Sequence, residues 1–281
     1  FSLRRQRQMC IRDSSEPAYD RCPQCGGIMK HIGTGTQKVE EELHALFPGA
    51  KVLRMDTDTV GASHGHEKLL RQFEEEKIPI LLGTQMVAKG LDFENVTLVG
   101  VLCADASLYI DNYRAPERTF SLLSQVVGRA GRGSRQGRAI IQTFTPENEV
   151  IRAAAAQDYD AFYESEIRMR RLRRYPPFAD LFSFTVTGAD ESRVIRAAKA
   201  LRDALGYAVE RREELKPLSI EVLGPAGASV VKVNNRYRYR VFLVGKGCPA
   251  LRRLVAEYLY AFYQHKENRG LDIFADCNAI Q

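Results

Sequence analysis

The sequence predicts an α/β chain of two folded parts, and three observations carry this prediction. From residue 33 to about 150, short apolar runs alternate with amphipathic helical patterns, which is typical of a parallel sheet with helices on both faces. From residue 175 onward the order becomes strand, helix, strand, strand, helix, strand, as in a ferredoxin-like βαββαβ domain. The length of 281 residues agrees with about two domains.

The first part, residues 33–174, is expected to contain four strands, three intervening helices and a long closing helix. The run at 99–102 is continuously apolar, as in a strand that is buried on both faces. The closing helix, from about 148 to 172, ends before Pro176 because proline cannot continue a helix. The expected strands are 51–55, 78–82, 96–102 and 139–143, and the expected helices are 37–47, 66–76 and 116–127.

The second part, residues 175–281, is expected to be a C-terminal domain with two long helices. Its expected strands are 181–187, 219–223, 237–244 and 271–276, its helices are 191–212 and 250–265, and its loop is 224–227. Residues 1–20 are polar and aperiodic and are interpreted as a tail that does not look native, and residues 21–32 form a short knuckle-like segment.

Composition and charge exclude several classes of protein. Hydrophobic residues make up 44% and charged residues 27%, which is typical of globular domains and excludes a disordered chain. No run of about 18 apolar residues occurs, which excludes a membrane span, and the first residues lack the apolar core of a signal peptide. Six cysteines are too few for a disulfide framework, so we expect a cytoplasmic protein. The net charge of +6 suggests a polyanionic partner.

The string Ser-Gln-Val-Val-Gly-Arg-Ala-Gly-Arg-Gly, which begins at residue 124, is the most informative one in the chain. Gln125, Arg129 and Arg132 are four and three residues apart, so a helix would place them on one face. The two intervening glycines leave room for another backbone or a ligand, and guanidinium groups suit phosphate oxygens. The alternative is a solvated basic helix end with a glycine cap.

A second segment runs from the apolar strand at 78–82 into Gly83-Thr84 and then into a helical turn. Free backbone N–H groups at such a turn, together with the threonine hydroxyl, form an anion site. The polar positions that follow are Gln85, Lys89, Gly90 and Asp92. The alternative is an ordinary turn between strand and helix, with Thr84 as the N-cap.

Together these two segments resemble motifs V and VI of the superfamily 2 helicases. Arg114-x-x-Glu117-Arg118 and Tyr175-Pro-Pro-Phe178 narrow the resemblance to the PriA family of bacterial primosomal replication-restart helicases (primosomal protein N′), over about residues 21–281. The resemblance implies a second RecA-like helicase lobe, ATP-dependent 3′-to-5′ DNA unwinding, and primosome assembly. It also implies forked and single-stranded DNA, single-stranded-DNA-binding protein and primosome proteins as partners.

The same resemblance implies a role for each of these motif residues. The implied catalytic residues are the arginine fingers Arg129 and Arg132 with Gln125, the nucleotide-binding residues are Lys89, Gly90 and Asp92, and the DNA contacts are Thr84 and Gln85.

The nucleotide cradle of such enzymes has no counterpart in this sequence. Neither Gly-x-x-x-x-Gly-Lys-[Ser/Thr] nor Asp-Glu-x-His occurs in it, and in these enzymes both lie in the first lobe. We therefore expect that an ATP–Mg²⁺ site is completed only by that lobe, and that the chain does not hydrolyse ATP alone. The chain also begins with phenylalanine rather than methionine, which we interpret as the mark of a fragment.

Cys22-Pro-Gln-Cys25 has the geometry of half a zinc site, because two thiolates on a tight turn can bind one metal ion. The nearby Cys10 and His31 have no standard zinc-ligand spacing. The family resemblance matches Cys22 and Cys25 to the last of several cysteine pairs, so we expect Zn²⁺ in the complete protein and an incomplete site here. A thioredoxin-like redox motif is the weaker alternative.

Arg236, Arg238 and Arg240 alternate with two tyrosines in an expected strand. Alternation places the arginines on one face and the tyrosines on the other. With the tyrosines exposed, a base can stack on them; with the tyrosines in the core, the arginines alone form a phosphate-binding row. The resemblance implies DNA binding by this domain. The alternatives for the whole chain are a non-catalytic DNA-binding or adaptor module and another superfamily 2 translocase.

Overall fold

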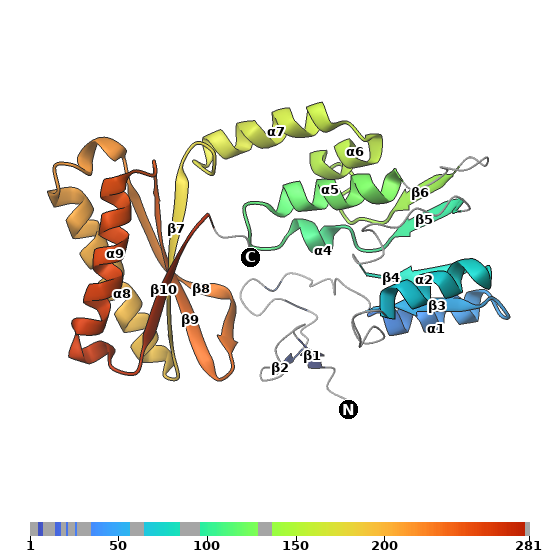
Figure 1. Cartoon of the computed structure of the whole chain (residues 1–281), viewed down its shortest axis with the longest axis horizontal. Helices are drawn as coiled ribbons and strands as arrows, with labels where there is room; N and C mark the ends of the chain where they lie inside the picture. The colour runs from blue at the N-terminus through green and yellow to red at the C-terminus, as the bar shows by residue number, and fades with distance from the viewer. Residues whose placement is uncertain are drawn as a thin grey trace. The chain divides into compact units, whose positions relative to one another are not determined.

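The computed structural model describes residues 5–7, 15–17, 21, 26, 35–56, 65–84, 96–128 and 137–278. The chain divides into two compact units (Figure 1). Residues 31–110 and 114–166 form one of them, which we call the α/β unit. Residues 1–30, 111–113 and 167–281 form the other, which we call the C-terminal unit.

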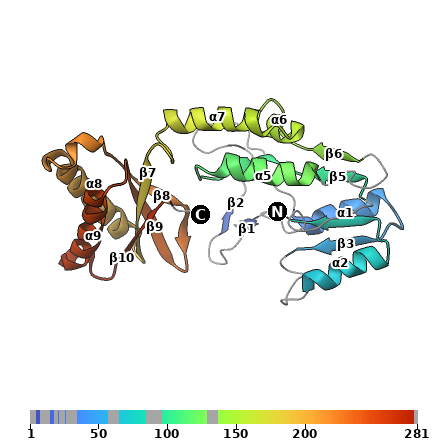
Figure 2. The ribbon, with the colours of Figure 1, turned by 45° about the horizontal axis from the view of Figure 1, so that its top comes forward.

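The first half of the α/β unit is a parallel strand pair between two helices. Strand β3 (Val52–Met55) pairs in parallel with β4 (Ile80–Gly83). Helices α1 (Thr36–Leu46) and α2 (Gly65–Glu75) lie on opposite sides of this pair (Figure 2). Along β3, half-buried and buried residues alternate as the strand pleat requires, and Met55 is fully buried.

The second half of the α/β unit is another parallel pair, of β5 (Leu98–Val101) with β6 (Arg138–Ile141). It continues with α4 (Asp105–Leu108), α5 (Ala115–Val127) and α6 (Glu149–Ala156). The core of this half consists of side chains from the helices and the strand ends. Its buried members are Ala104, Leu108, Phe120, Leu123, Ile151, Ala153, Ala154 and Phe162.

The expectation of a parallel α/β fold is confirmed, with two differences. The described strands form two separate two-stranded sheets rather than one continuous sheet. The expectation that the run at 99–102 is buried on both faces is wrong, because Leu102 is 52% exposed while Val101 packs against the core. Residues on alternate positions of β5 and β6 therefore divide into a packed face and an open face.

The single long helix expected at 148–172 is also wrong, because it is two helices. α6 ends at Gln157, which adopts the left-handed conformation with φ of 54°. α7 (Tyr159–Leu172) begins directly afterwards, and the Asp158 carboxylate accepts a hydrogen bond from the backbone N–H of Ala161 at 2.9 Å. Asp158 thus acts as an N-cap, and it restarts the helix where the apolar periodicity alone continues.

The C-terminal unit confirms the predicted ferredoxin-like order. Its strands are β7 (Asp180–Gly188), β8 (Glu221–Val233), β9 (Arg236–Gly245) and β10 (Asp272–Cys277), and its long helices are α8 (Glu191–Arg211) and α9 (Pro249–Gln264). The strands form one antiparallel sheet in the order β10-β7-β9-β8. Figure 1 shows both helices on one side of this sheet.

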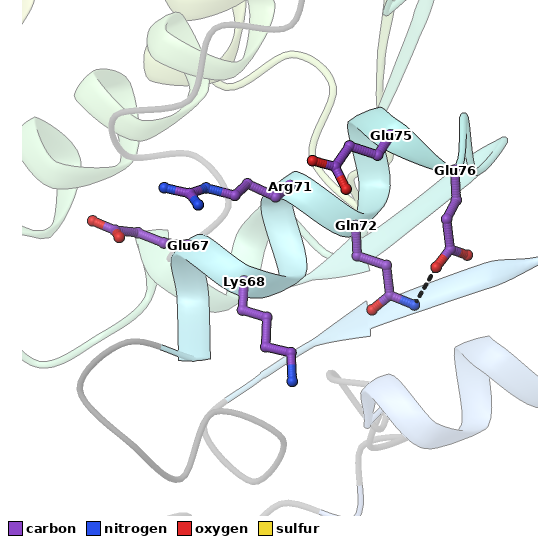
Figure 3. Close-up of a pocket in the computed structure, with 6 residues that line it drawn as sticks. All are labelled: Glu67, Lys68, Arg71, Gln72, Glu75 and Glu76. Atoms are coloured by element: carbon purple, nitrogen blue, oxygen red, sulfur yellow. Dashed lines mark hydrogen bonds between the residues drawn. The ribbon is translucent and has the colours of Figure 1, made fainter.

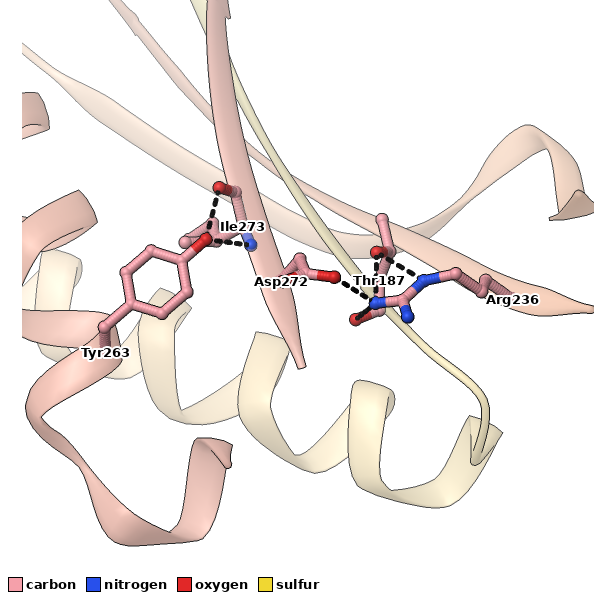
Figure 4. Close-up of polar contacts among 5 residues, drawn as sticks. All are labelled: Thr187, Arg236, Tyr263, Asp272 and Ile273. Carbon is pink, nitrogen blue, oxygen red and sulfur yellow. Dashed lines mark hydrogen bonds and ion pairs between the residues drawn. The ribbon is translucent and has the colours of Figure 1, made fainter. Parts of the chain in front are cut away.

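The core of the C-terminal unit lies between the sheet and these two helices. Alternate residues of β7 and β9 face the helices, and Phe184, Val186, Val241 and Leu243 are completely buried there. The hydroxyl of Tyr263, on α9, donates to the carbonyl of Ile273 and accepts from its N–H, both at 3.2 Å (Figure 4). This contact joins α9 to the edge strand β10.

Strand β8 is longer than predicted, and residues 224–227, which were expected to form a loop, are part of it. Two register shifts against β9 accommodate this stretch. Gly224 has a φ of 105°, and a Cβ atom there would lie 2.7 Å from the carbonyl oxygen of Arg240. Glycine is therefore required at this position of β8, which lies against the backbone of β9.

Three short features complete the described chain. In the N-terminal segment, β1 (Arg5–Arg7) pairs antiparallel with β2 (Ser15–Pro17), where the sequence predicts only a polar tail. Two 3-10 turns, η1 (Lys216–Leu218) and η2 (Lys266–Asn268), connect elements of the C-terminal unit. None of the described helices is both long enough and apolar enough to cross a membrane.

Candidate nucleotide and nucleic-acid contacts

Helix α5 presents Gln125 on the surface of the α/β unit. The helix has Arg114 as its N-cap residue and Pro116 in its first turn, where proline is tolerated. Its buried face is fixed by Phe120, whose ring stacks on Phe162 with centroids 4.2 Å apart, and by Leu123. Because these side chains face the core, Gln125 is exposed, in the last turn of the helix.

At Gly128 the near neighbour is a side chain of the same unit, and not the backbone or ligand that the glycines suggested. A Cβ atom on Gly128 would lie 2.9 Å from the side-chain amide nitrogen of Gln157. That nitrogen donates to the carbonyl of Ser124 at 3.4 Å. Gln157 therefore holds the end of α5 in place, a role that no pattern in the sequence indicates.

Thr84 is exposed and directly follows the carboxyl end of β4. This position is typical of ligand-binding residues in parallel α/β folds, and it agrees with the predicted strand-to-turn geometry. The other predicted residues of the two motifs lie outside the described residues. They are Gln85, Lys89, Gly90, Asp92, Arg129 and Arg132.

Asp105, at the start of α4, is a buried carboxylate that the sequence analysis did not single out. It is 1% exposed, and it accepts hydrogen bonds from the hydroxyls of Thr143 and Thr145 and from the N–H of Phe144, at 2.9, 2.7 and 2.9 Å. Burial acts to raise the pKa of this carboxyl group, and the hydrogen bonds outweigh it, so that its pKa lies below the ordinary value. The carboxylate ties α4 to the segment after β6.

The predicted arginine row lies on the sheet face opposite α8 and α9. Directly paired residues share a face. Arg238 is paired with Thr187, and Arg240 with Thr185. The helix-facing side of β9 instead carries Tyr237 and Tyr239, which pack against the core. Of the two alternatives in the sequence, the structure therefore has the one with the tyrosines toward the core and the arginines on the other face.

Arg236 is held by neighbouring strands, although its side chain is 40% exposed. Its guanidinium donates to the hydroxyl and the carbonyl of Thr187 at 3.2 and 3.3 Å, and it forms an ion pair with Asp272 (Figure 4). The contact links β9 across β7 to β10. An arginine engaged in this way clamps three strands, and its charge is already compensated.

Arg238 and Arg240 are placed differently. Arg238 is half-buried. Arg240 is only 6% exposed, and its Nε has no hydrogen-bond partner. Burial lowers the pKa of the Arg240 guanidinium, Arg238 lowers it further, and Asp111 and Asp276 raise it. This face thus contains a desolvated positive charge without the hydrogen bonds that a guanidinium normally makes.

A groove on α2 contains none of the predicted site residues. Figure 3 shows it along one side of the helix. It is lined by the charged or amide side chains of Glu67, Lys68, Arg71, Gln72, Glu75 and Glu76. Within it, Gln72 donates to Glu76 at 3.0 Å. With three carboxylates and two cations, the groove offers no net attraction to a phosphate.

The predicted zinc ligands Cys22 and Cys25 lie outside the described residues. Within the described ranges, no group of three or more histidine, cysteine or carboxylate side chains is arranged to hold a metal ion. The described cysteines, Cys103, Cys248 and Cys277, are free thiols.

Two family models match the chain, one in each half. Residues 32–134 match the helicase conserved C-terminal domain, and residues 171–278 match the primosomal protein N C-terminal domain. The replication restart protein PriA of Bacillus subtilis (strain 168) is 40% identical over 94% of this chain and 32% of its own length. The chain belongs to the PriA family. The PriA proteins of Synechocystis and Treponema pallidum are 40% and 37% identical, over 79% and 90% of the chain.

The family resemblance found in the motifs is thereby confirmed, and so is the fold that it implies. The chain spans about a third of the length of the PriA relatives, between 26% and 37% in the three cases. The PriA-type C-terminal match covers the whole four-stranded sheet with its arginine row. The helicase match covers Thr84 and Gln125, the two motif side chains that the structure describes in the α/β unit.

Proposed function

We propose that the chain supplies the second motor lobe and the DNA-binding domain of an ATP-dependent helicase that moves 3′ to 5′ in replication restart and primosome assembly. Membership of the PriA family and the helicase C-terminal domain support this proposal. The observation that carries it concerns the sheet face with Arg236, Arg238 and Arg240, which we call the arginine face. This face holds the buried guanidinium of Arg240, whose Nε has no hydrogen-bond partner.

The three arginines of this face have separate functions in the proposal. Arg236 is compensated by Asp272 and clamps the strands. Arg238 makes the outer contact with a DNA phosphate, because its guanidinium can reach solvent. Arg240 lies behind it and supplies a desolvated charge, which attracts a phosphate more strongly than a hydrated one does. Such contacts bind the sugar–phosphate backbone without reading the base sequence.

The salt dependence of DNA binding tests this assignment. In the 281-residue chain, Arg238→Ala should weaken binding of a labelled single-stranded oligonucleotide and lower the salt slope by about one unit. The matched control is Arg202→Ala on α8, whose side chain pairs with Asp203 on the helical layer. Equal slopes for the parent and Arg238→Ala would remove the arginine face from the DNA-binding surface.

The nucleotide contacts are proposed as the sequence motifs imply them. Arg129 and Arg132 serve as arginine fingers with Gln125 beside them, and Lys89, Gly90 and Asp92 lie at a nucleotide–Mg²⁺ site that the first lobe completes. The chain alone should show no DNA-stimulated ATPase activity. With the first lobe supplied, Arg129→Ala and Arg132→Ala should each lower turnover at least about tenfold. Parental turnover in both variants would favour a non-catalytic DNA-binding module instead.

The remaining parts of the proposal concern metal and partners. Cys22 and Cys25 are proposed zinc ligands in a site shared with further cysteines of the complete protein. Thr84 and Gln85 are proposed contacts with the DNA backbone. Forked and single-stranded DNA, single-stranded-DNA-binding protein and primosome proteins are the proposed partners, in the cytoplasm. Tightly held, stoichiometric zinc in the isolated chain would show that the site is complete without other cysteines.

A further inference from the structure

The two edges of the C-terminal sheet are finished in different ways. At one edge, the hydroxyl of Tyr263 satisfies both the carbonyl and the N–H of Ile273, so these outward groups of β10 are already bonded (Figure 4). At the other edge, β8 pairs only with β9 among the described strands. Within the described part of the chain, no side chain is hydrogen-bonded to the backbone of Glu221–Leu223, where β8 begins. An open edge of this kind is a template for another strand.

A groove of about 430 Å³ lies beside this open edge, between α8 and the beginning of β8. Helix α8 packs against β8 from the side of the sheet that carries the hydrophobic core. A strand added to β8 would therefore run alongside α8, and every second side chain would point to the groove. The apolar wall of the groove consists of Tyr207, Val209, Ile220 and Val222.

Gly206 lines the groove from the interior of α8. Glycine weakens the interior of a helix, and close approach of another chain segment is a usual reason for it. Beyond its own turn of helix, no atom of the described chain lies within 4 Å of the place that a Cβ atom would take. Packing within the described chain therefore gives no reason for glycine at this position. What the glycine provides is room beside the helix.

The groove contains one carboxylate without a counter-ion. Arg202 and Asp203 form an ion pair at 2.7 Å, so their charges compensate each other. Glu210 is exposed and forms no ion pair or hydrogen bond with any described residue. Between them, the ring of Tyr207 is held by Arg211, whose guanidinium carbon lies 5.1 Å from the ring centroid. The groove thus offers an apolar wall and a negative charge, which suit an apolar side chain next to a cation.

We infer that an extended peptide segment of a partner protein, with apolar and basic side chains on one side, adds to the open edge of β8 and fills this groove. Its backbone bonds to Glu221–Leu223, an apolar side chain packs on Tyr207, and a lysine or arginine pairs with Glu210. A second copy of the chain fits less well, because Glu221–Leu223 carries a carboxylate and no cation. The inference does not depend on DNA binding, because Arg238 lies on the opposite face of the sheet.

The probe is the heptapeptide Thr-Lys-Thr-Val-Thr-Lys-Thr, with fluorescein at its N-terminus and an amide at its C-terminus. Its symmetric pattern presents lysine and valine to the groove in either strand direction. Fluorescence anisotropy should show binding to the whole 281-residue chain. Hydrogen exchange should slow for at least one amide of residues 220–223 and stay unchanged at Ile273. The same peptide with N-methyl groups on its three central amides should not bind, because it lacks the donors that strand addition needs.

Gly206→Leu tests the groove with a variant that should keep its fold. Leucine is a better helix former than glycine, and the position has room for a side chain, so the Tm should not fall. Peptide affinity should fall at least about tenfold, because the new side chain occupies the groove. The matched control is Ala200→Leu, at an exposed position of α8 outside the groove, which should bind the peptide as the parent does.

Glu210→Lys tests the charge of the groove. The variant should bind the lysine peptide on the order of fivefold more weakly, as expected for loss of one exposed ion pair. It should bind the matching glutamate peptide, Thr-Glu-Thr-Val-Thr-Glu-Thr, more tightly than the parent by a similar factor. The same change in affinity for both peptides would contradict the pairing with Glu210.

Three outcomes would overturn the inference. The first is a dissociation constant weaker than about 1 mM for the parent chain, or equal binding by the parent and Gly206→Leu. The second is a dimer in sedimentation that Gly206→Leu separates, because a second copy would then fill the groove. The third is loss of peptide binding in Arg238→Ala, because the peptide would then lie on the arginine face. Weaker DNA binding in Arg238→Ala with unchanged peptide binding is the expected result, and it shows that the two sites are separate.

Discussion

Each of the two units buries a charged side chain, and the two are held in opposite ways. In the α/β unit, the Asp105 carboxylate is 1% exposed and accepts three hydrogen bonds from residues 143–145. In the C-terminal unit, the Arg240 guanidinium is 6% exposed, and its Nε has no partner. A buried charge whose partners are complete serves the fold, whereas one whose partners are missing indicates a ligand.

The two units also differ in where their candidate site residues lie. In the α/β unit, Thr84 and Gln125 lie at the ends of elements whose packing fixes them. In the C-terminal unit, Arg238 and Arg240 lie within a strand, where the sheet fixes the backbone and leaves one face uncovered by the helices. The first arrangement suits precise contact with one nucleotide, and the second suits a repeating phosphate backbone.

The largest effect is expected at Asp105. Asp105→Asn removes the charge and replaces one carboxylate oxygen by an NH2 group. That NH2 group cannot accept hydrogen bonds from the N–H and hydroxyl donors around it. The α/β unit should lose about 2–4 kcal/mol of unfolding free energy, because buried donors are left without acceptors. Denaturant unfolding of the chain, followed by hydrogen exchange within α4, measures this loss. A loss below about 1 kcal/mol would show that Asp105 is not a structural anchor.

Because of Asp105, we also expect the stability of the α/β unit to depend on pH, with an effect of intermediate size. Its pKa is lower in the folded than in the unfolded protein, so its contribution is fully present above the ordinary value of 3.8. The contribution is lost as the pH falls through the folded pKa. Stability of the α/β unit should therefore fall more steeply below about pH 4 in the parent than in Asp105→Asn. Parallel curves for the two proteins would contradict the lowered pKa.

Much of the fold could be predicted from the sequence because its signals are local. Apolar runs and helical periodicity located the four strands of the C-terminal sheet, and two prolines marked where the helical segment before it ends. The break between α6 and α7 was missed because the left-handed Gln157 and the N-cap Asp158 interrupt an apolar pattern that itself continues. Strand β8 was predicted too short because glycine and proline normally end strands, and here two register shifts carry it onward.

In the candidate sites too, local features could be predicted from the sequence, and contacts between distant segments could not. Alternation in β9 could predict that the arginines share a face, because that follows from the pleat of one strand. It could not predict that Arg236 pairs with Asp272 or that Arg240 has no partner, because these depend on strands that meet only in the folded sheet. Asp105 was missed for the same reason: its donors are about forty residues further along the chain.

The smallest effect on stability is expected at Arg240. It tests most directly the contrast between Asp105, whose hydrogen bonds are complete, and Arg240, whose hydrogen bonds are not. Arg240→Met keeps the length of the side chain and removes a desolvated charge that has no hydrogen bond at Nε. Replacing a poorly compensated buried ion by an apolar side chain of similar volume is often neutral or stabilising. The unfolding free energy should therefore change by less than about 1 kcal/mol, while DNA affinity falls and its salt slope decreases by about one unit. Asp111 and Asp276, which are exposed, would remain hydrated and add little cost. A loss of several kcal/mol with unchanged DNA binding would mean that Arg240, like Asp105, serves only the fold.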